Sequence, residues 1–301
     1  MDVLVLGSAA GGGFPQWNCG CAQCAGVRNG APGLTARTQD SLAVSAGGDW
    51  FLINASPDVA TQLSRHEELW PKSGRGSPVA GVVLTNGDID HTLGLFVLRE
   101  WQPLSVYATP RVWQGLQENA MLRSLQRFEG HLVWRPLELD RATELSGALG
   151  EPSGLRVEAF AAPGNPPLHL SGRYAGTAED NVGLRLSAES GGSVIYASST
   201  ASPEPLRTRC DGSDLLLVDG TFWSDDEPLA FDASRNARAM GHVPISGPEG
   251  SLTLLAGTRV GKRVYTHVNN TNPILDEHSL ARKHVHDAGF VVAEDGMRFS
   301  F

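Results

Sequence analysis

The stretch that decides the fold of this chain reads VVLTNGDIDHTLG and covers residues 82–94. Its apolar, β-branched beginning predicts a buried strand, and the apolar spacing that starts at Gly94 predicts a helix. Between these two elements lie Asp88, Asp90 and His91. Carboxylate oxygens and an imidazole nitrogen in one short loop suit Zn, Fe or Mn, and two rigid elements would hold that loop in place. The alternative is that the acidic residues only cap the N-terminus of the helix.

The composition is that of a folded, soluble protein, with 301 residues, 41% of them hydrophobic and 19% charged. The formal net charge is −9 and basic residues do not cluster, which argues against nucleic acid or an anionic membrane surface as a partner. The first residues lack the pattern of a signal peptide, and no later segment has 18 uninterrupted apolar residues. We therefore expect a cytoplasmic protein, in which clustered cysteines bind metal more often than they form disulfides.

Such a cluster lies near the N-terminus, at Cys19, Cys21 and Cys24. Three thiols within six residues can surround one tetrahedral ion as thiolates, and the motif predicts a structural Zn site. The alternatives are a redox pair or unconnected buried cysteines, but a thioredoxin-like motif has no third thiol two residues upstream. Cys210 stands alone, which is typical of a small buried apolar residue.

The rest of the chain predicts alternating strands and helices, and strands dominate from residue 155 onward. The expected strands are residues 3–6, 41–45, 50–54, 106–108, 155–160, 182–186, 193–197, 215–218 and 262–266. Helices are expected over residues 111–127 and 248–256. Asp219 follows one strand and His267 follows another, at the strand ends where α/β sheets place their ligands. Four other histidines have no ligand residues nearby in the sequence and are expected at the surface, namely His66, His131, His169 and His278.

Strands that end in Asp- and His-bearing loops resemble the metallo-β-lactamase fold, an αββα sandwich with metals at one edge. The signature of that superfamily is Thr-His-x-His-x-Asp-His, and residues 85–91 match its frame. The whole chain is similar to a family of pyrroloquinoline quinone (PQQ) biosynthesis proteins within the superfamily. The segments that carry this resemblance are DHTLGL (90–95), DGTFW (219–223), GHVPIS (241–246) and THVNNTNP (266–273). The resemblance implies a single four-layer α/β domain over residues 1–301, with the cysteine motif as an N-terminal zinc-binding loop.

The departures from the signature concern one of two metals. In hydrolytic members of the superfamily, one ion is held by the two early histidines of the signature and by a third in a Pro-Gly-His turn. The corresponding positions here are Asn86, Asp88 and Asn165. The aspartate that bridges the two ions is also absent, because Ser198, Ser199 and Thr200 stand after the strand that should carry it. The ligands of the second ion are kept as Asp90, His91 and His267.

The resemblance therefore implies one active-site metal instead of two. Two imidazoles and one carboxylate with open positions are typical of non-haem Fe(II) oxygen chemistry, whereas a dinuclear hydrolase needs both ions. We predict a labile Fe(II) held by Asp90, His91 and His267, with Asp88 as a further ligand or as an acceptor that orients an imidazole N–H. Asp219 and His242 resemble the proton-donating pair of the ribonuclease branch, and a purely structural role is the alternative for both.

The fourth ligand of the structural zinc has two candidates. A phosphodiesterase branch with a similar triple-cysteine site supplies this ligand three residues after the last histidine of the metal site. The matching residue here is Asn270, although an amide is a poor Zn ligand compared with His or Cys. His242 is the rival, but it cannot easily serve both the zinc and proton transfer.

The resemblance implies a role in making PQQ from a Glu–Tyr unit excised from a ribosomal peptide. The leading hypothesis is an Fe(II)- and O₂-dependent hydroxylation of the tyrosine ring. The second is a non-catalytic carrier that binds PQQ or a precursor and helps its transport to the periplasm, and the third is a hydrolase inherited from the superfamily. The expected partner is a small peptide-derived precursor, and a homodimer is one option for the assembly.

Overall fold

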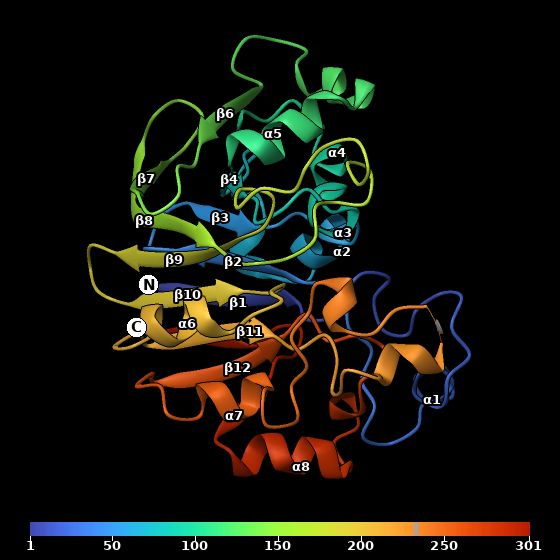
Figure 1. The fold of residues 1–301 in the computed structure, drawn as a ribbon. Coiled ribbons are helices and arrows are strands. Elements are labelled where there is room, and N and C mark those ends of the chain that lie inside the picture. Colours follow the sequence, from blue (N-terminus) through green and yellow to red (C-terminus); the bar gives the residue numbers. More distant parts are fainter. Residues whose placement is uncertain (232–233) are drawn as a thin grey trace.

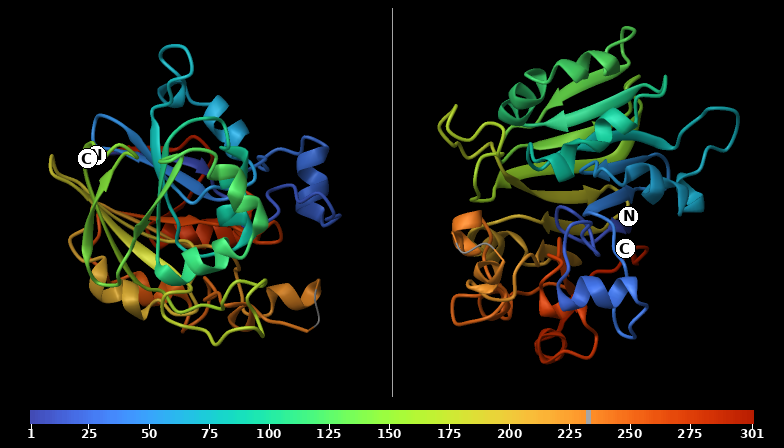
Figure 2. Two further views of the ribbon diagram at one scale, coloured as in Figure 1. Left: turned by 90° about the horizontal axis from the view of Figure 1, so that it is seen from above. Right: turned by 90° about the vertical axis from the view of Figure 1, so that its right-hand side faces the viewer.

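Two β-sheets of seven strands each form the centre of the molecule in a computed structural model that describes residues 1–231 and 234–301 (Figures 1 and 2). The first sheet contains β1 (Asp2–Gly7), β2 (Ser41–Ser45), β3 (Trp50–Ile53), β4 (Val79–Val83), β5 (Leu104–Ala108), β6 (Leu132–Pro136) and β14 (Arg298–Ser300). The second contains β7 (Ala142–Ser146), β8 (Pro152–Ala161), β9 (Val182–Ala188), β10 (Ser193–Ala197), β11 (Leu215–Asp219), β12 (Lys262–Thr266) and β13 (Phe290–Val292). Their spatial orders are β14-β1-β2-β3-β4-β5-β6 and β13-β12-β11-β10-β9-β8-β7.

Short helices cover the outer faces of the sheets (Figure 1). The α-helices are α1 (Ala22–Arg28), α2 (Val59–Ser64), α3 (Ile89–Thr92), α4 (Gly94–Val97), α5 (Pro110–Gln117), α6 (Glu204–Arg209), α7 (Ser251–Leu255) and α8 (Leu280–Asp287). The 3-10 helices are Glu67–Leu69, Ala120–Leu125, Glu227–Ala230, Arg238–Met240 and Pro273–Leu275. None of the helices in the described part of the chain has the length and the apolar character that crossing a membrane requires.

Strand alternation produces the layers, because successive side chains of a strand point to opposite faces. In β10, Val194 and Tyr196 belong to the core between the two sheets, whereas Ile195 and Ala197 belong to the core beneath α6, α7 and α8. On the first sheet, Val3 and Val5 face the other sheet, and the outward residues of the same strand pack with those of α2, α4 and α5. The αββα sandwich expected from the sequence is therefore confirmed.

Parallel pairing brings the loops that carry the expected ligands to one edge of the sandwich. β3, β4, β5 and β6 are parallel neighbours in the first sheet, and β10, β11, β12 and β13 are parallel neighbours in the second. The carboxyl ends of parallel strands meet on the same side, so the loops after β4, β11 and β12 can converge.

The expected helix over residues 111–127 is wrong in its length. α5 ends at Gln117, and a 3-10 helix follows at Ala120–Leu125. Asn119 separates the two because its backbone is extended and its side chain accepts a hydrogen bond from the Met121 N–H. An Asn that caps a new helix in this way ends the preceding one. The helix expected over residues 248–256 is also shorter, at Ser251–Leu255.

The expected surface position of two histidines is also wrong. His66 and His131 are buried, and His131 stacks on Phe128 with ring centroids 4.5 Å apart. His169 and His278 are exposed as expected. Cys210 is fully buried, which confirms its interpretation as a small core residue.

Candidate functional site

The strand and the helix of the central stretch form as predicted, as β4 and α4, but Asp90 and His91 lie in a further short helix, α3, and not in a loop. His267 lies directly after β12, in a left-handed backbone conformation with φ 55°. The ligand atoms of Asp90, His91 and His267 all lie within 4.8 Å of one another. Asp88 occupies the N-cap position of α3 but makes no capping hydrogen bond with its side chain within the described structure. The capping interpretation therefore fails for Asp88.

The distances among the three side chains suit one ion. Asp90 Oδ2 lies 3.3 Å from His267 Nε2 and 3.9 Å from His91 Nε2. Ligand atoms at about 2.1 Å from a metal, at right angles to each other, are about 3 Å apart. His91 Nε2 is buried and has no hydrogen-bond partner in residues 1–231 and 234–301, so its lone pair is available. The chemistry and the spacing of this set therefore fit a bound cation.

The charges at this site prepare it for a cation. Burial would raise the pKa of Asp90, but the neighbouring His91 ring and the hydrogen bond with His267 hold it well below its usual range. Burial lowers the pKa of His91 to about 4, so its ring is neutral at neutral pH. Burial would also lower the pKa of His267, but the hydrogen bond to Asp90 and the surrounding carboxylates raise it to about 9. A metal ion that binds here replaces the proton of His267.

Asp88 lies beside this set and not within it. It lines the same cavity of about 250 Å³ as the three residues, but it belongs to none of the ligand groups found among the described residues. Burial and the negative charge of Asp90 raise the pKa of Asp88 to about 6. Its role as a further ligand or as an orienting acceptor stays a prediction.

Two of the three positions that would hold a second ion are engaged elsewhere. Asn86 donates from Nδ2 to Asn181 Oδ1 at 3.2 Å, and its Oδ1 accepts the Asp88 N–H. Asn165 donates from Nδ2 to the Ala239 carbonyl at 3.0 Å. The amides of both residues are therefore used in hydrogen bonds within the protein.

Asp219 and His242 form a direct pair at the same edge. His242 Nδ1 lies 2.8 Å from Asp219 Oδ2, and the His242 ring stacks on the His267 ring with centroids 5.7 Å apart. Asp219 also accepts hydrogen bonds from the backbone N–H groups of Thr200 and Thr221 and from the Thr221 hydroxyl. Burial would raise the pKa of Asp219, but the charge of His242 and its hydrogen bond keep it low. Although these atoms also satisfy the distances of a metal set, both oxygens of Asp219 are already occupied.

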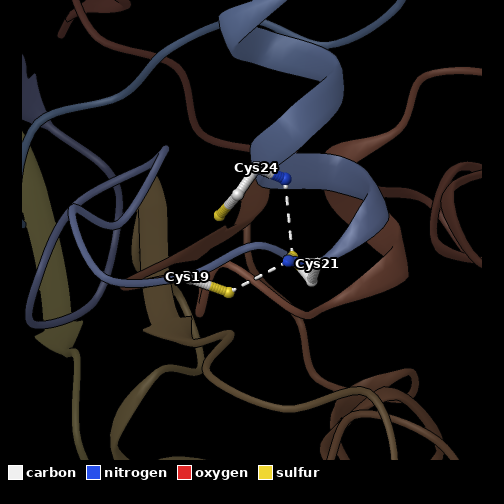
Figure 3. A group of neighbouring side chains, drawn as sticks. All are labelled: Cys19, Cys21 and Cys24. Carbon is white, nitrogen blue, oxygen red and sulfur yellow. Dashed lines mark hydrogen bonds between the residues drawn. The ribbon is translucent and has the colours of Figure 1, made fainter.

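The three cysteines expected to bind zinc converge at the start of α1 (Figure 3). Cys19 Sγ accepts the Cys21 N–H and Cys21 Sγ accepts the Cys24 N–H, both at 3.4 Å. Burial raises the pKa of the Cys24 thiol to about 11, so a bound cation is what would make it a thiolate. The three cysteines thus lie close enough to hold one metal ion, and the Cys24 thiol would lose its proton when that ion binds.

Asn270, and not His242, faces the cysteines. Its Nδ2 lies 3.1 Å from Cys19 Sγ, 3.4 Å from Cys24 Sγ and 3.9 Å from Cys21 Sγ. With the amide turned by 180°, its oxygen would occupy the same place. Because His242 is held by Asp219, the geometry favours Asn270 as the fourth group at the proposed zinc site.

The cavity at the metal set continues toward the cysteine loop. A larger neighbouring cavity of about 640 Å³ shares Phe222, Met240 and Asn269 with it. Cys19, Gly20 and Cys21 line the far side of this space. A cavity within the usual size range of small-molecule sites therefore lies between the two candidate metal sites.

The sequence prediction missed the two threonines that hold the imidazoles. Thr85 Oγ1 lies 3.3 Å from His91 Nδ1, and Thr221 Oγ1 lies 2.9 Å from His267 Nδ1. Each threonine follows shortly after a buried apolar strand and lies close to the expected ligands, in the TNGDIDH and DGT segments. That position was the available signal, because metal-binding imidazoles usually donate their other N–H to a fixed acceptor.

Comparisons with known proteins identify the family of the chain. Residues 49–268 match the family model described as beta-lactamase superfamily domain. The chain is 41% identical over 302 residues to the coenzyme PQQ synthesis protein B of Ruegeria pomeroyi, and the match covers 99% of both chains. The chain belongs to the coenzyme PQQ synthesis protein B family.

Solved structures give the same result. The crystal structure of Zn²⁺-bound PqqB from Methylobacterium extorquens matches with a TM-score of 0.92 and 38% sequence identity, over 100% of both chains. A diphosphatase of the PhnP family matches with a TM-score of 0.71 at 19% identity, over 100% of this chain and 96% of the other, which shows a common fold. The fold is therefore that of the metallo-β-lactamases.

A half-buried glutamate beside the larger cavity gives a prediction about pH. The Glu227 carboxylate accepts hydrogen bonds from the Trp223 N–H and the Thr271 hydroxyl, yet burial raises its pKa to about 7 from an ordinary 4.5. The folded state therefore binds this proton more tightly than the unfolded state, and stability is lost as the pH rises from about 4.5 to about 7. Glu227→Gln keeps the shape of the protonated form at every pH. We expect its free energy of unfolding, relative to that of the native protein, to be about 1–3 kcal/mol higher at pH 8 than at pH 4.5.

The measurement is urea unfolding of both proteins at pH 4.5 and at pH 8. Any change in the zinc-dependent part of stability with pH is the same in the native protein and in Glu227→Gln. The difference between their free energies of unfolding therefore reports on Glu227 alone. An equal difference at both pH values would mean that Glu227 is not preferentially protonated in the folded state.

Proposed function

We propose that this protein acts in PQQ biosynthesis as a non-haem Fe(II)- and O₂-dependent hydroxylase of the tyrosine ring of a Glu–Tyr precursor. The observation that carries the proposal is the set of Asp90, His91 and His267 beside asparagines that are bonded elsewhere. Two imidazoles and one carboxylate are the ligands of Fe(II) oxygenases, and a single ion does not suit dinuclear hydrolysis. When bound, Fe(II) would supply the one-electron and O₂ chemistry that the side chains lack.

Zinc is proposed for the second site. Cys19, Cys21 and Cys24 would hold it with Asn270 as the fourth group, and three thiolates favour Zn over a labile Fe(II). The Zn²⁺-bound crystal structure of the Methylobacterium extorquens relative supports zinc as a ligand of this family. The two sites therefore differ in their donors, with sulfur in one and oxygen and nitrogen in the other.

Asp219 and His242 would handle protons at the reacting edge. Asp219 fixes the Nδ1–H of His242, which leaves Nε2 as the nitrogen that can hold or release a proton in the cavity. Ring hydroxylation places one oxygen atom of O₂ in a C–H bond and releases the other as water. The balance requires two electrons from an added reductant and two protons, and His242 is placed to deliver protons.

The substrate would occupy the two connected cavities. The cavity at the metal set, about 250 Å³, is smaller than an ordinary small-molecule site, whereas the neighbouring space of about 640 Å³ is of sufficient size. The tyrosine ring would enter the first and the remainder of the peptide the second. Phe222 and Met240 line both spaces and would contact the aromatic ring.

The test is oxygen incorporation by protein loaded with Fe(II) without oxygen. After addition of a Glu–Tyr peptide, a reductant and ¹⁸O₂, we expect a catechol product that carries one ¹⁸O atom, detected by mass spectrometry. The control is protein with zinc in both sites, which we expect to give no such product because Zn²⁺ has no redox chemistry. Absence of labelled product at full iron occupancy, with this peptide and with longer precursors, would contradict the proposal.

A carrier of PQQ or a precursor is the second candidate, and the larger cavity favours it because binding alone would suffice there. A carrier has no use for the Asp90, His91 and His267 set. Cells whose only copy of the protein carries His91→Ala distinguish the two functions. Undiminished PQQ secretion supports the carrier, and loss of PQQ supports the hydroxylase.

A further inference from the structure

A line of hydrogen bonds leads from the back of His91 to a carboxylate between the two sheets. Thr85 Oγ1, 3.3 Å from His91 Nδ1, donates to Asn54 Oδ1 at 3.1 Å. Asn54 donates from Nδ2 to the Tyr196 hydroxyl at 3.2 Å, and Tyr196 donates to Asp40. All five side chains are buried, and the proposed function assigns a role to His91 alone. Four buried polar groups thus support one expected ligand.

The hydrogen-bond partners of this line assign a direction to each bond. Asn54 Oδ1 also accepts the Thr85 backbone N–H at 3.0 Å, which fixes the orientation of the amide. Since the only hydroxyl hydrogen of Thr85 is used by Asn54, Thr85 can only accept from His91. His91 must therefore carry its proton on Nδ1. Its Nε2 is then a free lone pair, in agreement with the missing partner of that atom among the described residues.

The backbone at Asn54 indicates that this arrangement is held against a conformational cost. Asn54 has φ 60°, a left-handed conformation, and its side chain is fully buried. Asn tolerates this region better than most residues, but it still costs free energy outside a glycine. The residue directly follows β3, so the amide is presented to Thr85 and Tyr196 at the sheet edge.

The far end of the line ties the two halves of the molecule together. Asp40 directly precedes β2 in the first sheet, and it accepts from Tyr196 of β10 and from the Thr266 hydroxyl of β12 in the second. Thr266 is the neighbour of His267 in the chain. The Asp40 carboxylate is therefore linked to His91 through Tyr196, Asn54 and Thr85. It is linked to the strand that carries His267 through Thr266 alone.

We infer that Thr85, Asn54 and Tyr196, ending on Asp40, are positioning residues that fix the tautomer and the ring orientation of His91 for metal binding. The inference rests on the metal-binding role of His91 in the proposed function, and not on hydroxylation. His267 has a shorter equivalent, because Thr221 donates to Asp219 at 2.7 Å and is left to accept from His267 Nδ1. Each imidazole thus donates to a threonine whose own proton goes to a deeper acceptor.

The test measures Mn²⁺ affinity by calorimetry in oxygen-free buffer, with the cysteine site already filled by zinc. We expect Thr85→Val to weaken Mn²⁺ binding by about 10–100-fold, the usual effect of removing a group that orients a ligand. Thr85→Ser, which keeps the hydroxyl, should restore an affinity close to that of the native protein. Thr109→Val is the matched control, because Thr109 is equally buried and donates to the Glu179 carbonyl, away from the metal set.

Two further variants keep the test decisive if Thr85→Val does not fold. Asn54→Gly removes the amide while accepting the left-handed backbone, and Tyr196→Phe removes only the hydroxyl. We expect both to weaken Mn²⁺ binding, with the larger effect for Asn54→Gly because it contacts Thr85 directly. The visible spectrum of bound Co²⁺ should change in the same order, since it reports the ligands and not the stability of the fold.

The outcomes separate the inference from the function on which it rests. If the native protein binds Mn²⁺ and the Thr85→Val and Asn54→Gly variants bind it within twofold of that affinity, the inference is wrong and the proposed metal site stands. If the native protein binds no Mn²⁺ beyond the cysteine site, both are wrong. If Thr109→Val weakens binding as much as Thr85→Val, the effect is one of general stability and the positioning role is wrong.

Discussion

If the proposed function is correct, replacing His267 by alanine is expected to remove the proposed active-site metal and hydroxylase activity while the zinc proposed for the cysteine loop remains at one ion per chain. His267 lies 3.3 Å from Asp90, and its ring stacks on that of His242. It therefore belongs both to the set with Asp90 and His91 and to the set with Asp219 and His242. Without it, one imidazole and one carboxylate remain, which is too few to hold a labile divalent ion tightly. We expect a loss of at least about 100-fold in affinity, because even groups that only orient a ligand are worth 10–100-fold.

Metal content after purification without oxygen, together with ¹⁸O incorporation, measures this effect. His278→Ala is the matched control, since His278 is an exposed histidine outside the metal-binding groups identified among the described residues. A thermal melt of both variants separates loss of the metal from loss of the fold. Undiminished iron content and product formation in His267→Ala would remove this residue from the proposed site.

Replacing Cys24 by serine is expected to empty the zinc site and to lower the melting temperature by about 5–10 °C. Cys24 is fully buried, and a serine hydroxyl cannot replace its thiolate as a zinc ligand. The free energy of structural zinc binding is part of the folding free energy, and each kcal/mol corresponds to about 2–4 °C in a protein somewhat smaller than this one. The cluster also connects α1 to Asn270, so its loss frees the N-terminal loop from the edge that carries His267.

Cys210→Ser is the control for this second prediction. Cys210 is as buried as Cys24 but lies outside the cysteine cluster. Its replacement should therefore lower the stability somewhat and leave the zinc content unchanged. Zinc content by mass spectrometry and calorimetric melting of the two variants give the comparison. A Cys24→Ser protein that keeps one zinc per chain would show that the ion is held by other residues.

The central strands could be predicted from the sequence because both of their faces are buried. Strands such as β10 and β11 are apolar at every position but their ends, and such runs are recognisable without any knowledge of their partners. The four strands that the prediction missed, β6, β7, β13 and β14, are the outermost strands of the two sheets. Each has one unpaired side and mixed burial, so its local pattern is weak and its pairing depends on residues far along the chain.

The candidate ligands could be predicted because Asp90 and His91 share one short segment after a recognisable strand and His267 directly follows another. The resemblance to the superfamily signature then joined the three into one set. The residues that hold these ligands in position could not be predicted. Asp40 and Tyr196 are 156 residues apart in the chain, and neither position predicts that one donates to the other. The burial of His131 likewise depends on Phe128 and on the packing of an outer strand, which no local pattern contains.

The proposed iron ligands come from both sheets, since Asp90 and His91 follow β4 of the first and His267 follows β12 of the second. An ion held by all three would link the two sheets across the seam where they pack against each other. Any opening of that seam would have to release the ion, so each tenfold rise in free metal above the dissociation constant adds about 1.4 kcal/mol to the cost of opening. Metal occupancy and the strength of contact between the sheets would rise together, and a shortage of iron would loosen the edge at which the peptide is proposed to bind.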